Sequence, residues 1–307
     1  MRLSSLWVAA LTTVVALPIS YAEQRGPKRH TTTSRRARDK IAERDKSSSP
    51  SVVATATLDP SPLPPPGVTL TQGAVLVAMT LEMSLSANTE GVPASLAPDI
   101  SAGVTHDLTL SLVHSGSAMT GFRGGAGAGF CFTGDGPGKC KTSYAGGGIE
   151  GLYSLTRGTF ASAANAGLLL TSVDPGRYDF KLGFKTKLAL GTTTSLVFNP
   201  SVWLALNDRN DPMAPHESQL LLPIGLVQKL TPKLAVGVGS GVRGPTSALG
   251  TRYAIPAGVL VQFALDSHVT FGSSFVFGRI VGGSELMNPE PGPESRALQM
   301  WLNVASR

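Results

Sequence analysis

Short runs of alternating apolar and polar residues repeat along the chain from about Ala74 onward. In the run 75–85, apolar side chains recur at every second position, and polar residues such as Thr80 and Glu82 stand between them. A period of two residues is typical of a β-strand with one apolar face, and about eleven residues let a tilted strand cross a membrane. The pattern therefore predicts strands, and no segment has a convincing helical period.

The clearest alternation lies between Tyr178 and Leu188. One face of this run is apolar and carries Tyr178, Phe180, Leu182, Phe184 and Leu188. The other face carries Asp179, Lys181, Gly183, Lys185 and Lys187. In a membrane barrel the apolar face would meet lipid and the polar face would meet the lumen.

Repetition of this pattern predicts the fold. Twelve strands are expected, at about 75–85, 94–103, 108–115, 146–155, 160–171, 177–188, 194–206, 218–228, 234–243, 252–264, 269–278 and 296–306. Short turns follow every second strand, and the longest connections, 116–147, 207–217 and 279–295, fall on the other side. Loop lengths divided between two rims are typical of outer-membrane barrels. We therefore predict an all-β protein, a transmembrane antiparallel β-barrel of about 12 strands with a disordered N-terminal linker.

Residues 1–22 have the pattern of a cleavable signal peptide. Arg2 supplies a positive start, and the apolar stretch from Leu6 to Leu17 is too short to span a bilayer as a helix. Ser20-Tyr21-Ala22 places small residues before a cut at Glu23. We expect export through this signal and location in the outer membrane.

Residues 23–67 are predicted to be a disordered linker, basic and Ser/Thr-rich at first and Pro-rich at its end. It could be a plain spacer, or it could tether the protein to an anionic partner such as cell wall or lipid headgroups. The barrel is then expected to occupy residues 68–307.

The positive charge of the chain belongs to its N-terminal part. Of 26 basic and 20 acidic residues, ten basic and four acidic ones lie at or before Lys46, which leaves 16 of each. A neutral remainder does not indicate a nucleic-acid-binding fold. We expect outer-membrane lipid as a partner, and no nucleic acid.

The segment Ser95-Leu96-Ala97-Pro98-Asp99-Ile100-Ser101-Ala102-Gly103-Val104-Thr105-His106-Asp107-Leu108-Thr109-Leu110 resembles a hairpin of bacterial outer-membrane, porin-like β-barrels. The Gly-rich stretch before Gly151-Leu152-Tyr153-Ser154-Leu155 is similar to barrels of the myxobacterial lineage. The resemblance implies an outer-membrane β-barrel of porin-like type. One departure is that many such barrels end in Phe or Trp, whereas this chain ends in Arg307.

Two cysteines, Cys131 and Cys140, lie close together in a Gly-rich segment. An even number of cysteines in an exported chain favours a disulfide. We expect these two residues to form one, which would close a short surface loop.

Charged residues at inward positions of the predicted strands are candidates for lining the lumen. They are Glu82, Asp99, Glu150, Asp179, Lys181, Lys185 and Lys187. Two interpretations remain open, a charged constriction that selects permeants and an interior plugged by salt bridges.

Enzymatic and metal chemistry have weaker signals. His216 and Ser218 have the spacing of outer-membrane phospholipases, but Gln228 stands where those enzymes have an Asn that orients the histidine. The acidic loop 207–217 lacks the spacing of a calcium loop. We predict no catalytic residue, no metal and no cofactor.

The sequence predicts a passive pore or small-solute channel. The alternatives are a structural or adhesive surface protein that presents long loops and, more remotely, a phospholipase-like hydrolase.

Overall fold

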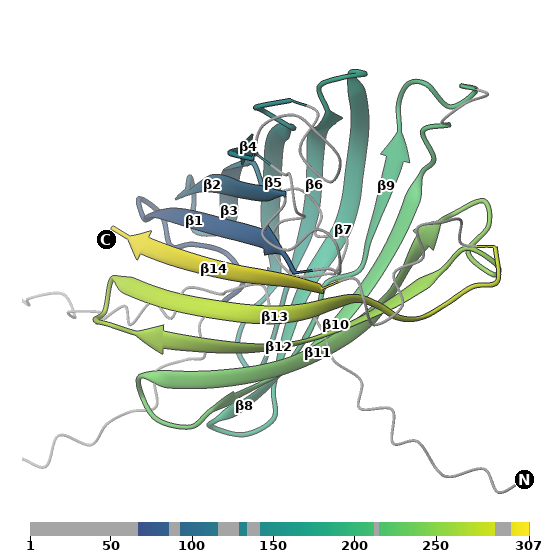
Figure 1. Ribbon diagram of the computed structural model, residues 1–307. Coiled ribbons are helices and arrows are strands. Elements are labelled where there is room, and N and C mark those ends of the chain that lie inside the picture. Colours follow the sequence, from purple (N-terminus) through teal and green to yellow (C-terminus); the bar gives the residue numbers. More distant parts are fainter. Residues whose placement is uncertain are drawn as a thin grey trace, which may run out of the picture. The chain divides into compact units, whose positions relative to one another are not determined.

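The computed structural model describes residues 67–85, 93–115, 129–133, 142–211, 215–285 and 296–306. In these ranges the regular structure consists of strands (Figure 1), and no helix is long and apolar enough to cross a membrane. The predicted signal peptide and all but the last residue of the predicted linker lie outside these ranges. Their boundaries therefore stay predictions.

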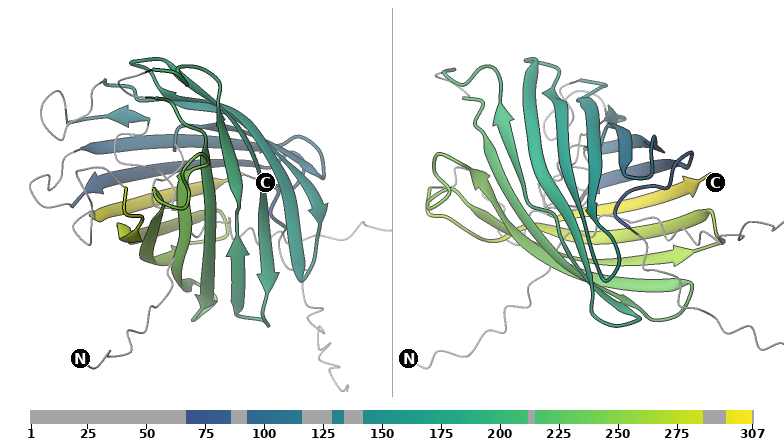
Figure 2. Two further views of the ribbon diagram at one scale, coloured as in Figure 1. Left: turned by 90° about the vertical axis from the view of Figure 1, so that its right-hand side faces the viewer. Right: turned by 180° about the vertical axis from the view of Figure 1, so that it is seen from behind.

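The strands are β1 (Val75–Ser84), β2 (Ala94–Gly103), β3 (Leu108–Val113), β4 (Phe130–Cys131), β5 (Gly147–Thr156), β6 (Phe160–Ser172), β7 (Arg177–Ala189), β8 (Thr194–Phe198), β9 (Ser201–Ala205), β10 (Gln219–Lys229), β11 (Leu234–Pro245), β12 (Ala254–Ala264), β13 (Val269–Gly282) and β14 (Arg296–Ala305). Neighbours pair antiparallel, and β1 pairs with both β2 and β14. This last pairing closes the sheet into a barrel, whose wall can be followed from β1 to β14 in Figure 2. Because β8 and β9 share one place in the wall and β4 only extends the β2 edge, the closed barrel has twelve strands, as predicted.

The two rims of the barrel differ in their connections. Five turns of three or four residues join strands at one rim, at 104–107, 157–159, 190–193, 230–233 and 265–268. Both ends of the barrel chain reach the same rim, because the first residues of β1 pair with the last residues of β14. The other rim carries longer connections, at 85–93, 114–146, 206–218, 246–253 and 283–295, and one short turn at 173–176. The predicted division of loop lengths is confirmed.

Three of the short turns share one pattern of side-chain to backbone hydrogen bonds. The oxygen of Thr105, Thr231 or Asp266 accepts hydrogen bonds from the backbone N–H groups two and three residues later. Such contacts satisfy donors that the strand ladder leaves free in a tight turn. The spacing from this residue to the next strand therefore fixes where β3, β11 and β13 begin.

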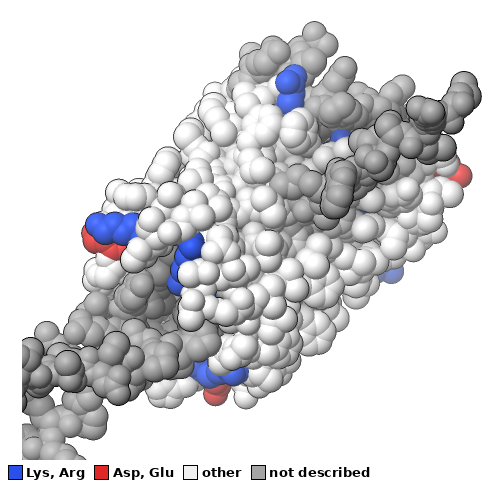
Figure 3. Space-filling view, turned by 90° about the horizontal axis from the view of Figure 1, so that it is seen from below, with Lys and Arg blue, Asp and Glu red and all other residues white. Residues whose placement is uncertain are grey.

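The two faces of the wall differ in exposure. On β7, Phe180, Leu182 and Phe184 are 36%, 45% and 51% exposed, whereas Asp179, which immediately precedes Phe180, is 3% exposed. The outer face of the barrel is therefore apolar and its inner face polar. The described part of the face seen in Figure 3 carries few charged side chains.

The inner face also holds small apolar clusters between its polar groups. Leu169, Trp203 and Leu221 form one, and Leu260, Val276 and Trp301 form another. Glycines recur beside them on β11, where Gly237 and Gly239 are buried and Val238 between them is exposed. Small inner residues allow a narrow barrel to curve and leave space for larger neighbours.

Strand β3 ends at Val113, two residues earlier than predicted. The reason is Asp99 of β2, whose carboxylate accepts hydrogen bonds from the backbone N–H groups of His114 (2.7 Å) and Ser115 (2.9 Å). These N–H groups are therefore not available to the ladder. The unpredicted strand β4 then pairs with β2 through Ser95 and Leu96.

The predicted strand 194–206 is broken at Asn199-Pro200. The carbonyl oxygen of Pro200 accepts a hydrogen bond from the N–H of Phe184 (2.9 Å), but proline has no N–H of its own to give to the ladder. The wall continues through β9 after this interruption.

Candidate functional site

The predicted lumen residues lie on the inner face. The four carboxylates are buried, with exposed fractions of 3% for Glu82, 8% for Asp99, 5% for Glu150 and 3% for Asp179. Lys181, Lys185 and Lys187 share the inner positions of β7 with Asp179. The structure joins some of these groups and gives others separate partners.

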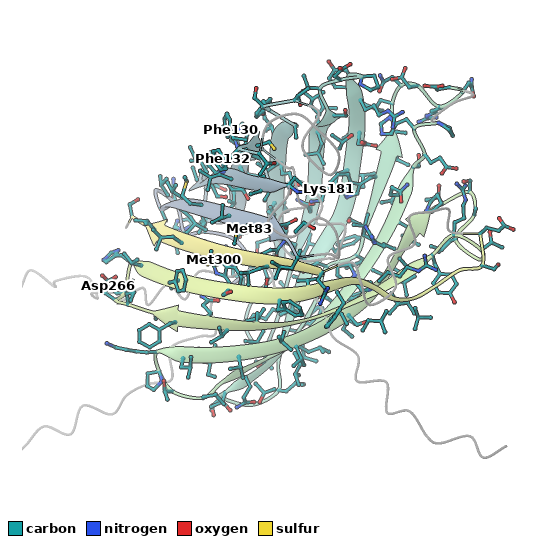
Figure 4. All side chains as sticks on the ribbon, viewed as in Figure 1. Met83, Phe130, Phe132, Lys181, Asp266 and Met300 are labelled. Carbon is teal, nitrogen blue, oxygen red and sulfur yellow. The ribbon has the colours of Figure 1, made fainter. Side chains whose placement is uncertain are left out.

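Glu150 and Lys181 form the central ion pair. The Lys181 ammonium donates to the Glu150 carboxylate at 2.6 Å, and the Asn165 amide donates to the same carboxylate at 3.2 Å. The ammonium also lies 5.4 Å from the ring centroid of Trp203, a distance at which a cation is attracted to an aromatic face. Lys181 is labelled in Figure 4. Strands β5, β6, β7 and β9 together build this cluster.

Asp179 is held near the rim of long loops. Its Oδ2 accepts a hydrogen bond from the Thr171 hydroxyl at 2.6 Å and lies 3.0 Å from Nε2 of His216. The other ring nitrogen of His216 lies 3.1 Å from the carbonyl oxygen of Asn207. The pair ties the start and end of the loop 206–218 to the wall.

Glu82 lies on the opposite part of the wall, away from the lysines. Its carboxylate accepts a hydrogen bond from the Gln299 amide, and the Ser274 hydroxyl donates to Gln299 at 3.0 Å. None of the salt bridges formed by the described residues includes Glu82. The polar groups around Glu82 are therefore amides and hydroxyls, beside the apolar cluster of Leu260, Val276 and Trp301.

Three cationic groups of the inner wall have no carboxylate at salt-bridge distance within the described part of the chain. They are Lys187, Lys229 of β10 and Arg243 of β11. Nε of Arg243 is buried without a hydrogen-bond partner. The wall from β7 to β11 therefore has an excess of positive charge.

The structure does not assemble a phospholipase-like dyad from His216 and Ser218. Both ring nitrogens of His216 are used by Asp179 and Asn207, and the Ser218 hydroxyl accepts a hydrogen bond from the N–H of Ala205 at 3.1 Å. Glu217 between them pairs instead with Arg252, with bonds of 2.5 and 2.7 Å.

Two further predictions concern cysteines and metals. Cys131 lies in β4, but Cys140 lies outside the described residues, so the disulfide between them stays a prediction. Among the described residues there is no group of three His, Cys, Asp or Glu side chains that could hold a metal ion.

Several residues that complete the inner wall were not predicted from the sequence. Trp203, Arg243 and Gln299 stand at inward positions of strands that were predicted, and Lys229 follows directly after the predicted strand 218–228. The two-residue period that selected Lys185 would have selected Trp203 and Gln299 too, since each alternates with outward apolar neighbours. Lys229 lay beyond the predicted end of its strand, next to the polar Gln228. Their partners, however, depend on which strands are neighbours around the barrel.

Comparisons with known proteins bear on the fold. No protein-family model and no curated protein matches the chain. Among solved structures, the NanC porin is similar over 74% of this chain and 98% of its own, with 6% identity and a TM-score of 0.53. The KdgM porin matches over 76% of this chain and 99% of its own, with 9% identity and a TM-score of 0.48.

An outer membrane channel from Pseudomonas putida F1 is similar over 81% of this chain and 100% of its own, with 12% identity and a TM-score of 0.47. At such low identities the likeness shows the fold alone. The expected likeness to barrels of the myxobacterial lineage finds no support in these comparisons.

Proposed function

We propose that this protein is an outer-membrane channel for small solutes whose interior favours anions. The membrane part of the proposal is supported by the outer surface. Ile149, Leu168 and Phe184 are 64%, 56% and 51% exposed on outward positions of three neighbouring strands. Water would make such a surface prone to aggregation, whereas lipid is the solvent that suits it.

The observation that carries the anion preference is the excess of cations between β7 and β11. Glu150 offsets Lys181, but Lys187, Lys229 and Arg243 have no carboxylate partner in the described ranges. Uncompensated charges of one sign in a narrow passage attract counter-ions and exclude ions of the same sign. The seven residues predicted from sequence to line the lumen are part of this proposal, as is outer-membrane lipid as the partner.

Planar-bilayer recording under a salt gradient tests the proposal. The purified protein should give discrete conductance steps with a reversal potential on the anion side. Replacing Lys187 and Lys229 together by Gln should move the reversal potential toward that of a non-selective pore. Lys233→Gln is the matched control, because Lys233 stands in a short turn and is exposed to solvent.

Folded protein that never conducts would contradict the channel and would favour a surface role for the long loops. Conductance with an unchanged reversal potential in the double variant would contradict the role of the two lysines.

A further inference from the structure

The segment before β1 enters the barrel at the rim of short turns. We call residues 67–74 the strap. Val68 is 9% exposed and belongs to one buried cluster with Leu152 of β5 and with Ala161 and Ala163 of β6. These three residues occupy inward positions of their strands, so the side chain of Val68 lies inside the wall.

Hydrogen bonds hold the strap along the inner face between β1 and this cluster. The N–H of Leu70 donates to the hydroxyl of Thr109 on β3 at 2.8 Å. The N–H of Gly73 donates to the carbonyl of Gly103 at the end of β2, also at 2.8 Å. The strap therefore crosses β2 and β3 before it reaches β5 and β6. From β1 to β6 it follows the inner face past four of the twelve neighbouring-strand pairings of the barrel.

Two glycines make this path sterically open. Gly73 has a φ of 78°, which favours glycine and lets the chain turn from the strap into β1. At Gly103, an added Cβ would lie 2.0 Å from the carbonyl oxygen of Thr71, closer than any side chain could tolerate. The end of β2 is thus shaped to let the strap cross it.

The strap ends beside the basic part of the wall. Ala161 and Ala163 are paired in register with Lys187 and Lys185 of the neighbouring strand β7. Val68 therefore packs against wall positions that lie next to these lysines, at the rim of short turns.

From this placement we infer that the strap is the element that limits the width of the passage at the rim of short turns. A solute that crosses there passes between Val68 and the lysine side of the wall. The inference rests on the proposed channel function and names the segment that sets its size limit.

The position of the strap is tested first, without reference to transport. In the full-length chain with Cys131 and Cys140 replaced by Ser, Val68→Cys is combined with Leu152→Cys or with Ala163→Cys. Oxidation should link Val68→Cys to at least one of them, as peptide mapping would show. The matched control combines Val68→Cys with Leu168→Cys, which is on β6 but faces outward and should not be linked.

The width of the passage is tested next by single-channel conductance. Val68→Asn places an amide in an apolar cluster, which disfavours docking of the strap, so conductance should rise. Gln72→Asn makes a comparable change at an exposed position of the strap and should leave conductance unchanged. Oxidation of a linked double-cysteine variant should keep conductance at the level of the unmodified chain.

The outcomes separate this inference from the proposed function. If no cross-link forms, or if Val68→Asn and Gln72→Asn conduct equally, the strap does not limit the passage although the channel stands. If the cross-link forms but no variant conducts, the channel function fails, and the role of the strap in permeation fails with it.

Discussion

Each buried carboxylate of the inner wall is stabilised by a different kind of donor. Glu150 meets a lysine, Asp179 a histidine and a threonine, Glu82 a glutamine, and Asp99 two backbone N–H groups. A buried charge is tolerated when such partners replace the water that it loses. Since three of the four carboxylates have partners other than lysine, the inner lysines are not all neutralised, and this difference underlies the proposed anion preference.

A pH-sensitive contact links two of the long connections. Glu217 accepts hydrogen bonds from Arg252 and from the Ser247 hydroxyl, and the Arg252 bonds lower the pKa of the Glu217 carboxyl. A lowered pKa stabilises the folded contact above the ordinary value of about 4.3, and this stabilisation is lost as pH falls through the lowered value. The contact should therefore hold at pH 7 and weaken in acid.

Hydrogen exchange of the segment 246–253 would measure this, after correction for intrinsic rates. Exchange should increase in acid in the unmodified protein. Glu217→Gln should raise the exchange rate already at pH 7. The free energy of opening should fall by no more than about 1 kcal/mol, as for a partly exposed ion pair. Asp107→Asn, at the opposite rim, is the control. Equal protection at both pH values in the unmodified protein would show that the ion pair does not hold this loop.

At the scale of elements, β7 shows how the alternation assigns faces. A one-residue slip would move Lys181 and its neighbours to the lipid side. Leu182 is 45% exposed on the outer face, so Leu182→Arg would place a charge in lipid at about 2–4 kcal/mol near the midplane. This variant should insert poorly, whereas Lys185→Glu should fold. Heat-modifiable gel migration reports folding. If Leu182→Arg folded normally and Lys185→Glu did not, the assignment of these side chains to the lipid and lumen faces would be wrong.

The short turns allow a second test of an element. Asp266, labelled in Figure 4, accepts hydrogen bonds from the N–H groups of His268 and Val269, and these bonds lower the pKa of its carboxyl. Asp266→Thr should be tolerated, because Thr105 and Thr231 fill the same place in two other turns. Asp266→Ala leaves the two donors without a side-chain acceptor and should lower the yield of refolded barrel.

The turn that contains Asp266 should become less stable in acid. A lowered carboxyl pKa stabilises the turn above the ordinary aspartate value, and the stabilisation disappears as pH falls through the lowered one. Refolding of the unmodified chain should therefore become less efficient in acid, and Asp266→Thr should be less affected. Equal yields for the Ala and Thr variants would show that the side-chain acceptor does not direct this turn.

The strands were predictable because each carries its own alternation and ends at a turn with its own chemistry. What the sequence could not predict depends on contacts between distant segments. Asp99 ends β3 early by binding Ser115, and β4 pairs with β2 only after that. Lys181 was placed on the correct face, but its contact with Trp203 needs β9 beside β7. The strap lacks any period, so its path inside the wall was not foreseen.

At the scale of the whole molecule, the described strands close into a barrel downstream of the predicted linker. Every described strand and every step of the closed wall lies between Val75 and Ala305, and the strap begins at Gly67. Removing residues 23–61 therefore leaves every described strand and the whole strap in the chain. A barrel stays folded when its hydrogen-bond ladder is complete, since closure leaves no open edge.

We expect the chain without residues 23–61 to give the same β-rich circular dichroism spectrum and the same heat-modifiable migration as the full chain. Its single-channel conductance should also be unchanged, because Val68 keeps its place against Ala163. This result would show that the strap, and not the linker, limits conductance. Val68→Asn is expected to raise conductance both in the full chain and in the chain without residues 23–61. A truncated chain that fails to insert would show that the linker takes part in assembly. A truncated chain that inserts but conducts more strongly would mean that residues before the strap also occupy the passage.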